Sequence, residues 1–364
     1  MYAAVLRSAE GPYELEEIVL EDPAPDQVLV QLAGTGLCHT DTLLRAPGFT
    51  KLPVIGGHEG AGVVQEVGAA VRGIAVGDHV VLSFGSCGAC HSCLGARPAY
   101  CQEFQARNMS CREPDGSTPA RALNGDAVGA RWFQQSSFAT HALATARNVV
   151  VVDRTLPIDM LGPLGCAVQT GAGSVFSVLR VQPGTALLVC GAGAVGLSAV
   201  MAARVAGAGV VIAVDQHESR LKLARELGAT HVVHDTGPGL TEQVNAITGE
   251  GVEYALDTTG VPEVITAAIG AVRPPGIVGL VGMQRGDLAV GPLDLGLGRT
   301  LVGIVEGDSV PQQLIPRLCS LWRRGEFPFD RMIRQYPLSE INEAERACLA
   351  GEVVKPIVLP GSLG

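Results

Sequence analysis

The first 150 residues carry short apolar runs that are separated by Gly, Pro and Asp. Examples are the runs 28–32, 62–67 and 79–83. Runs of this length with turn residues between them are typical of strands in a β-rich domain. The stretch 112–135 is polar and contains glycine, so we predict a long loop there.

From about Leu164 onwards, apolar runs alternate with stretches of helical periodicity. Helices are predicted over 194–206 and 218–227, with a further helix between the last two strands. Strands are predicted, in order, over 186–190, 210–215, 231–233, 254–256 and 277–281. Alternating strands and helices indicate a parallel sheet that is covered by helices.

The C-terminal tail has a pattern of its own. After about Val310, the hydrophobic positions predict a helix over 311–324 and strands over 331–336 and 355–359. We expect this tail to return to the first domain.

Length and composition support two domains. A chain of 364 residues is too long for one ordinary core, and 47% hydrophobic residues allow a large apolar area to be buried. We therefore predict an α/β protein. A β-rich catalytic domain would be formed by 1–167 and 305–364, and a doubly wound parallel-sheet domain by 168–304.

Charge and terminal patterns argue against nucleic-acid and membrane partners. The net charge is −10, with 26 basic and 36 acidic residues and no basic run, so a phosphate-neutralising surface is not expected. Residues 186–203 carry no charge and are long enough to suggest a membrane span. Glycines divide this run into a strand and a helix, so we do not predict a span there. The N-terminal residues lack a signal-peptide pattern, and we expect a cytoplasmic protein.

Four closely spaced cysteines form the strongest local motif. Cys87, Cys90, Cys93 and Cys101 lie in a glycine-rich lobe of about residues 83–105. Four thiolates can enclose one tetrahedral Zn²⁺ and leave no open position, so the motif predicts a structural zinc. An iron–sulfur cluster and two disulfides are the alternatives. The spacing differs from ferredoxin-type runs, and ten cysteines without a signal peptide favour metal over disulfides.

A glycine-rich turn predicts a dinucleotide site. Gly191, Gly193 and Gly196 form a G-x-G-x-x-G motif that follows an apolar strand and opens a helix. The first glycine would make the turn, the second would admit a pyrophosphate, and the third would allow close helix–strand packing. Asp215 ends the next strand, where a carboxylate binds ribose hydroxyls and repels a 2′-phosphate. We therefore predict that the protein uses NAD and not NADP, although Arg220 would suit NADP. The alternative is that the glycine-rich segment is a βα turn that binds no ligand.

A second metal set is suggested by Cys38, His58 and Cys166, each in a glycine-rich segment. A Cys₂His set leaves one tetrahedral position open, as catalytic zinc sites require. These residues are far apart in the sequence, and a buried structural Cys or His is a common alternative.

These motifs together resemble those of the zinc-dependent medium-chain alcohol dehydrogenases. The matching segments, in order, are GLCHTD, GHEGAGVV, the four-cysteine lobe, GPLGCAVQTGAG, the Rossmann glycines and GEVVKPIVL. The segments GARPAYCQEF, QQSSFATHAL, VEGDSVPQQLIP and RGEFPFD are similar to the bacterial aryl-alcohol (benzyl alcohol) dehydrogenase branch. The resemblance implies a GroES-like catalytic domain, a Rossmann coenzyme domain, two Zn²⁺ per chain and NAD.

The resemblance also implies roles for individual residues around the reactive zinc. Cys38, His58 and Cys166 would hold it, and the alkoxide of the bound alcohol would give hydride to NAD⁺. Thr40 would accept the alcohol proton, and Asp41 would orient His58. Glu59 would lie beside the zinc and pair with Lys355, which we assign to the cofactor side of the site.

On the cofactor, the resemblance places His39 against the pyrophosphate. Thr170 and Val195 would pack behind the nicotinamide ring. The carbonyls near Val281 and Val305 would accept hydrogen bonds from its carboxamide.

One position departs from the family pattern. Many relatives carry a histidine that ends the proton relay, whereas this chain has Leu43, so the proton must leave by another route. Phe84 and Met283 are candidate walls of the substrate pocket or ordinary core residues.

We therefore predict an NAD-dependent enzyme that oxidises primary aromatic or allylic alcohols reversibly to aldehydes, as a homodimer or homotetramer. A monoterpenol dehydrogenase of the geraniol or perillyl alcohol type is the nearest alternative. A glutathione-adduct formaldehyde dehydrogenase would need cationic groups at the pocket mouth, and no convincing set is seen. A non-enzymatic zinc- and NAD-binding protein is the remaining hypothesis.

Overall fold

The computed structural model describes residues 1–113, 115–234 and 239–361, which divide into two compact units. The first unit contains Met1–Cys166, Val310–Cys319 and Asp330–Gly364. The second contains Ala167–Ser309 and Ser320–Phe329. Most of the tail thus belongs to the first unit. Residues 305–309 and 320–329 belong to the second unit, whereas the sequence predicted them in the first domain.

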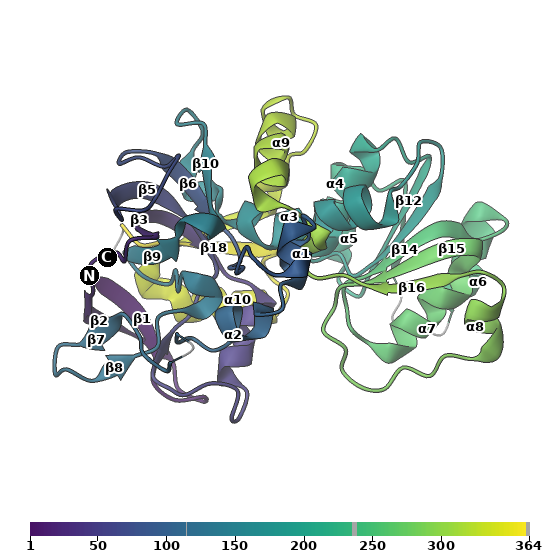
Figure 1. The fold of residues 1–364 in the computed structure, drawn as a ribbon. Coiled ribbons are helices and arrows are strands. Elements are labelled where there is room, and N and C mark those ends of the chain that lie inside the picture. Colours follow the sequence, from purple (N-terminus) through teal and green to yellow (C-terminus); the bar gives the residue numbers. More distant parts are fainter. Residues whose placement is uncertain (114, 235–238, 362–364) are drawn as a thin grey trace. The chain divides into compact units, whose positions relative to one another are not determined.

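Two largely antiparallel sheets build the first unit (Figure 1). The five-stranded sheet has the order β4 (Val54–Ile55), β1 (Tyr2–Leu6), β2 (Tyr13–Leu20), β7 (Ala120–Ala122) and β8 (Ala127–Val128). The seven-stranded sheet has the order β10 (Val149–Val152), β6 (His79–Leu82), β5 (Glu59–Val67), β3 (Gln27–Gly36), β18 (Lys355–Leu359) and β17 (Ile333–Pro337), with β9 (His141–Thr145) paired to β3.

Alternation along β3 shows why this sheet forms. Val28, Val30 and Leu32 are buried in an apolar cluster, whereas Gln31 between them is exposed. This period of two is what a strand with one buried face requires. The C-terminal β18 pairs with the last residues of β3, so segments from the beginning and the end of the sequence meet in one sheet.

The stretch 112–135 is not the long loop that its polarity predicted. It contains the short hairpin β7–β8 and a 3₁₀ turn over Trp132–Gln134. The hairpin strands have three and two residues, which is too short for an alternating pattern to be visible in the sequence.

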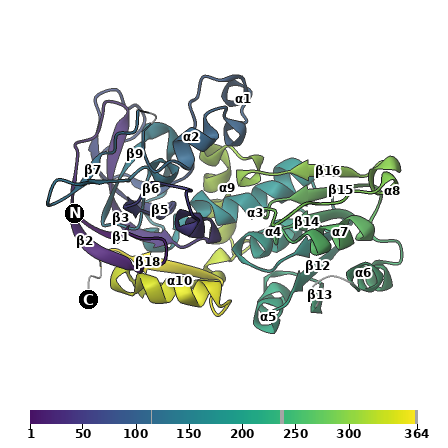
Figure 2. The same ribbon diagram turned by 90° about the horizontal axis from the view of Figure 1, so that it is seen from below.

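The second unit is a parallel sheet with helices on both faces. Its order is β13 (His231–His234), β12 (Val210–Asp215), β11 (Ala186–Cys190), β14 (Val252–Asp257), β15 (Val272–Leu280) and β16 (Thr300–Gly303), which Figure 2 shows side by side. Helices α4 (Ala194–Val205) and α5 (Glu218–Leu227) lie on one face, and α6 (Leu240–Thr248) and α7 (Pro262–Ala271) on the other (Figure 1). The predicted α/β class is confirmed.

The strand order of this sheet creates a place for a ligand. The chain proceeds outwards from β11 through β12 to β13, and then continues from β14 in the opposite direction. Such a reversal opens a crevice at the carboxyl ends of the two central strands, here β11 and β14. All five residues of β11 are buried, as expected of a strand covered on both faces.

The remaining helices are short or lie outside this sheet. They are α1 (His91–Leu94), α2 (Phe104–Asn108), α3 (Ala167–Gly173), which continues as a π-helix over Ser174–Leu179, α8 (Pro292–Gly296), α9 (Pro311–Arg323) and α10 (Ile341–Leu349). Across the described ranges, no helix has the length and hydropathy to span a membrane. The uncharged run 186–203 is strand β11 followed by most of α4.

Candidate active site

Asp41 fixes the orientation of His58. The Asp41 Oδ1 atom accepts hydrogen bonds from His58 Nδ1 at 2.7 Å, Trp132 Nε1 at 2.9 Å and the Gly57 amide at 3.2 Å, while Oδ2 accepts the Cys38 amide at 3.0 Å. Because Asp41 only accepts, His58 must carry its proton on Nδ1 when it is neutral. The lone pair of Nε2 is therefore available to a metal.

Two aromatic side chains hold the His58 ring in place. Phe133 stacks on it with a centroid distance of 4.4 Å and an interplanar angle of 23°, and Trp132 meets it edge-on at 6.2 Å. Phe133 adopts a left-handed φ of 48°, a conformation that costs free energy in a bulky residue and persists where the surroundings enforce it.

Sequence reasoning missed both of these aromatic residues. They fall in the stretch taken as a loop, and their one visible signal was the adjacent pair Trp132–Phe133 in a chain with 4% aromatic residues. Gln135 was also missed. Its Nε2 donates to the carbonyls of His58 and Ser83, and its Oε1 accepts the Gly60 amide at 3.0 Å.

The candidate metal ligands of the second set converge. Cys38, His58, Glu59 and Cys166 each place a ligand atom within 4.8 Å of all the others. His58 Nε2 is buried and has no hydrogen-bond partner among the described residues. A hydrogen bond with Cys166, opposed by burial, lowers the pKa of the Cys38 thiol well below its usual value. A buried nitrogen without a partner and a stabilised thiolate are what a Cys₂His zinc site offers.

Glu59 forms a buried ion pair beside these ligands. Lys355 Nζ lies 2.9 Å from both Glu59 carboxylate oxygens and donates to the Leu37 carbonyl at 3.1 Å. Burial raises the pKa of Glu59 although Lys355 opposes the shift. The predicted Glu59–Lys355 pair is therefore present, and the assignment of Lys355 to the cofactor side stays a prediction.

The segment after Cys38 carries the other predicted reaction residues on a 3₁₀ helix, His39–Arg45. Thr40 Oγ1 lies 3.7 Å from Cys38 Sγ, so its hydroxyl is at the metal site. His39 begins the helix. Leu43 packs against the apolar core of the first unit.

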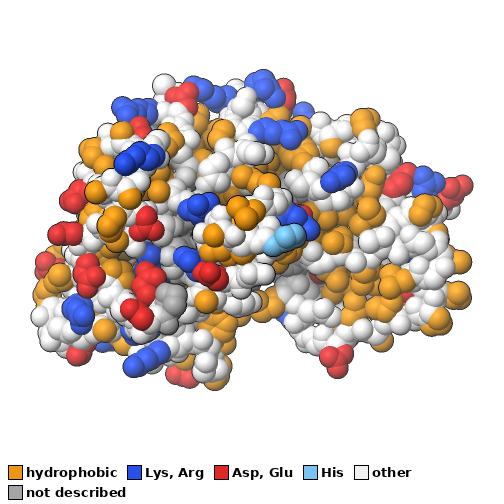
Figure 3. All heavy atoms as spheres, in the orientation of Figure 1, with side chains coloured by type: hydrophobic (Ala, Val, Ile, Leu, Met, Phe, Trp, Pro, Cys, Tyr) orange, Lys and Arg blue, Asp and Glu red, His pale blue; other side chains and the backbone are white. Residues whose placement is uncertain are grey.

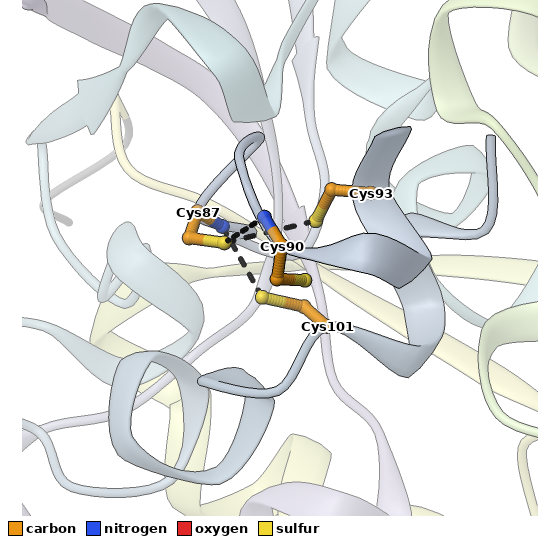
Figure 4. Close-up of side chains that lie close together, drawn as sticks. All are labelled: Cys87, Cys90, Cys93 and Cys101. Carbon is orange, nitrogen blue, oxygen red and sulfur yellow. Dashed lines mark hydrogen bonds between the residues drawn. The ribbon is translucent and has the colours of Figure 1, made fainter. Parts of the chain in front are cut away.

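The four-cysteine lobe also forms a metal-binding arrangement. The side chains of Cys87, Cys90, Cys93 and Cys101 point toward one another (Figure 4), with sulfurs within 4.8 Å. Backbone amides donate to these sulfurs, for example Cys90 N to Cys87 Sγ at 3.3 Å and Cys87 N to Cys101 Sγ at 3.3 Å. Amides of Gln102 and Cys93 lower the pKa of Cys90 to about 6, whereas burial raises that of Cys101 to about 12. All ten cysteines are free thiols, so the disulfide alternative is not seen.

The glycine-rich turn has the geometry that a pyrophosphate needs. Gly191 has a φ of 92°, and a Cβ on Gly196 would lie 1.8 Å from the Gly191 carbonyl oxygen, so both positions demand glycine. A Cβ on Gly193 would meet nothing within 4 Å, which leaves open space above the N-terminus of α4. The residues fit a bound dinucleotide.

Asp215 lies at the carboxyl end of β12, beside this turn. Its carboxylate accepts the amides of Ala192 and His217, each at 2.8 Å, and Arg220 approaches it at 3.9 Å. These contacts hold the Asp215 carboxylate where the adenosine ribose is expected to lie.

The other predicted cofactor residues lie at the same edge of the second unit. A Cβ on Gly171 would lie 2.1 Å from the Val195 carbonyl oxygen, so Thr170 and Val195 are on neighbouring segments. Val281 and Val305 follow β15 and β16. Met283 is 65% exposed and is therefore no core residue, whereas Phe84 is buried in the core of the first unit.

Comparisons with known proteins agree with this architecture. The family model described as "alcohol dehydrogenase GroES-like domain" matches residues 24–154, and "zinc-binding dehydrogenase" matches 194–320. The chain is 43% identical to a geraniol dehydrogenase of Castellaniella defragrans, over 98% of this chain and 97% of that protein.

Two solved structures are similar over 98% of both chains. The alcohol dehydrogenase zinc-binding domain protein of Burkholderia ambifaria has a TM-score of 0.96 and 46% identity. The benzyl alcohol dehydrogenase of Acinetobacter calcoaceticus has a TM-score of 0.94 and 41% identity.

Proposed function

Because this chain belongs to the zinc-dependent alcohol dehydrogenases, we propose that it oxidises primary aromatic or allylic alcohols to aldehydes with NAD⁺. The convergence of Cys38, His58 and Cys166 carries the proposal. Support for the substrate class comes from the two named relatives, since geraniol and benzyl alcohol are both primary alcohols with an unsaturated carbon next to the carbinol.

We assign the reactive zinc to Cys38, His58 and Cys166. Zinc held there would act as a Lewis acid that lowers the pKa of the alcohol. The chain's own groups then have separate tasks. Asp41 keeps the His58 proton on Nδ1, and the Thr40 hydroxyl accepts the proton that leaves the alcohol. Lys355 keeps Glu59 paired at 2.9 Å.

The cofactor and a second zinc complete the proposal. We assign NAD to the crevice beside Gly191, Gly193 and Gly196, with Asp215 as the acceptor for the ribose hydroxyls. We assign a structural zinc to the four-cysteine lobe. Between Cys87 and Cys101 its only buried residues are Ala99 and Cys101, so we expect this segment to depend on a metal to fold.

A substrate panel tests the function directly. The zinc-loaded protein is assayed by NADH absorbance with benzyl alcohol, geraniol and S-hydroxymethylglutathione, each with NAD⁺ and with NADP⁺. We expect turnover with the first two alcohols and a kcat/KM at least about tenfold higher with NAD⁺, the effect of about 1.4 kcal/mol. Cys166→Ser is the control for adventitious activity. A preference for the glutathione adduct, or no turnover at all, would refute the proposal.

The two lead substrates are also separable. A monoterpenol dehydrogenase would favour geraniol over benzyl alcohol in kcat/KM, and an aryl-alcohol dehydrogenase would show the reverse. The geraniol dehydrogenase relative at 43% identity favours the first, and the benzyl alcohol dehydrogenase structure favours the second.

We also propose that the protein is a homodimer or homotetramer. In Figure 3, hydrophobic side chains gather over the part of the second unit where Figure 1 places β16 and α8. Leu293 of α8 and Leu297, which lies between α8 and β16, are 69% and 60% exposed, and β16 is an edge strand. Such edges and patches are usually covered by another chain. Sedimentation of wild type and Leu297→Glu tests this, and a wild-type monomer at micromolar concentration would exclude it.

A further inference from the structure

A buried carboxylate that the proposed mechanism does not use lies just beyond β16. Glu306 is 9% exposed and has a left-handed φ of 49°. Gly307 and Asp308 follow with φ values of 68° and 46°, so three successive residues are left-handed. Non-glycine residues pay for this conformation, and such strain persists at functional sites where the surroundings enforce it.

Hydrogen bonds and close packing hold this turn against α3. The Glu306 Oε2 atom accepts from Gln169 Nε2 at 3.3 Å and from Thr170 Oγ1 at 3.4 Å. Ser309 Oγ donates to the Glu306 carbonyl at 2.7 Å. A Cβ on Gly173 would lie 2.5 Å from the Gly307 carbonyl oxygen. The position of Glu306 is therefore fixed.

The topology places Glu306 in the second half of the dinucleotide crevice. A cofactor whose pyrophosphate lies on the N-terminus of α4 and whose adenosine lies beside β12 extends its nicotinamide toward the other half of the sheet, β14 to β16. Glu306 lies just beyond the carboxyl end of β16. Through Thr170, it is also joined to the segment that packs on Val195 in the first turn of α4.

The charge of the nicotinamide differs between the two cofactor forms. The ring of NAD⁺ carries a positive charge, whereas the dihydronicotinamide of NADH is neutral. A fixed carboxylate in a site with little water acts more strongly on a charge than it would in solvent.

We propose that Glu306 is a positioning residue that stabilises the oxidised nicotinamide relative to the reduced one. This inference rests on the proposed use of NAD. Thr170 and the turn after β16 hold the carboxylate, and its charge sets the ratio of affinities for NAD⁺ and NADH. Removing the charge therefore weakens NAD⁺ binding more than NADH binding.

Equilibrium binding to the zinc-loaded protein tests the proposal without turnover. The Kd of NADH is measured by its fluorescence, and the Kd of NAD⁺ by competition with NADH. In Glu306→Gln the ratio of Kd for NAD⁺ to Kd for NADH is expected to rise about tenfold, or about 1.4 kcal/mol, the interaction of two unit charges about 12 Å apart at an effective dielectric of about 20. Glu306→Asp, which keeps the charge, should stay within about threefold of wild type.

Glu253→Gln is the matched control. Glu253 lies at the amino end of the central strand β14, away from the carboxyl ends that form the crevice, and its Oε2 accepts the Ala186 amide at 2.8 Å. Its removal should therefore leave the ratio unchanged. If Glu306→Gln does not fold, Glu306→Ala removes the same charge.

The outcomes separate this role from the proposed function. A rise of less than about threefold in the charge-free variant, an equal loss for both cofactors, or the same rise in Glu306→Asp would overturn the role of Glu306. A wild-type protein that binds neither cofactor would overturn the proposed use of NAD instead.

Discussion

Replacing Asp41 with Asn is expected to weaken the zinc site and the first unit together. All four recorded partners of the carboxylate are donors, at 2.7 to 3.2 Å. An amide has one acceptor oxygen and one donor nitrogen. With the oxygen in the place of Oδ1, its NH₂ group faces the Cys38 amide, and two donors meet in a buried site.

The cost follows from these contacts. One charge-assisted hydrogen bond is lost, at about 1.5–3 kcal/mol, and the other three become neutral and weaken by roughly 0.5–1 kcal/mol each. We therefore expect the free energy of unfolding to fall by about 3–6 kcal/mol. Zinc affinity at the Cys38–His58–Cys166 site should fall by about 10–100-fold, since the carboxylate no longer fixes His58.

Two measurements check this expectation. Urea denaturation gives the change in free energy of unfolding, and zinc competition with a chromogenic chelator gives the affinity. Trp132→Phe is the matched control, because it removes one donor to Asp41 and keeps the carboxylate. Trp132→Phe should lower the free energy of unfolding by about 1.5–3 kcal/mol and leave the zinc affinity close to that of the wild type. An Asp41→Asn protein with wild-type zinc affinity would refute the view that Asp41 orients His58.

Three further predictions concern other parts of the first unit. Cys93→Ala should lower the zinc content from two ions per chain toward one and lower the free energy of unfolding. If the folded variant lost turnover, the zinc of the four-cysteine lobe would not be purely structural. Lys355→Met should lower the free energy of unfolding by about 3–5 kcal/mol, because the buried Glu59 carboxylate loses its cationic partner, and adding Glu59→Gln should recover part of this loss in urea melts. Leu43→His should change the pH profile of alcohol oxidation, and an unchanged profile would show that the missing relay step is not limiting.

The sequence predicted the second unit more closely than the first. Helix α5 matches the predicted 218–227, and β11 matches the predicted 186–190. These elements have regular apolar spacing, and α5 ends before Gly228, whose φ of 123° favours glycine. Regular local patterns of this kind are visible without any tertiary contact.

The parts that sequence reasoning missed depend on contacts that no local pattern records. The left-handed Phe133 stacks on a ring 75 positions away in the chain, and the Trp132 indole donates to Asp41 across a separation of 91. Glu306 was passed over because its carboxylate is buried by Gln169 and Thr170, more than 130 residues earlier. Burial and strain at such positions arise only when the chain has folded.

The return of the C-terminal tail to the first unit sets an order of events during synthesis. Glu59 and β3 leave the ribosome early, but their partners Lys355 and β18 follow about 300 residues later. Until then, β3 lacks its β18 partner at Thr35 and Gly36, and Glu59 lacks Lys355, while the second unit can already fold around its local βα contacts. Nascent chains of this protein should therefore depend on protection of that open sheet edge until the last strand emerges.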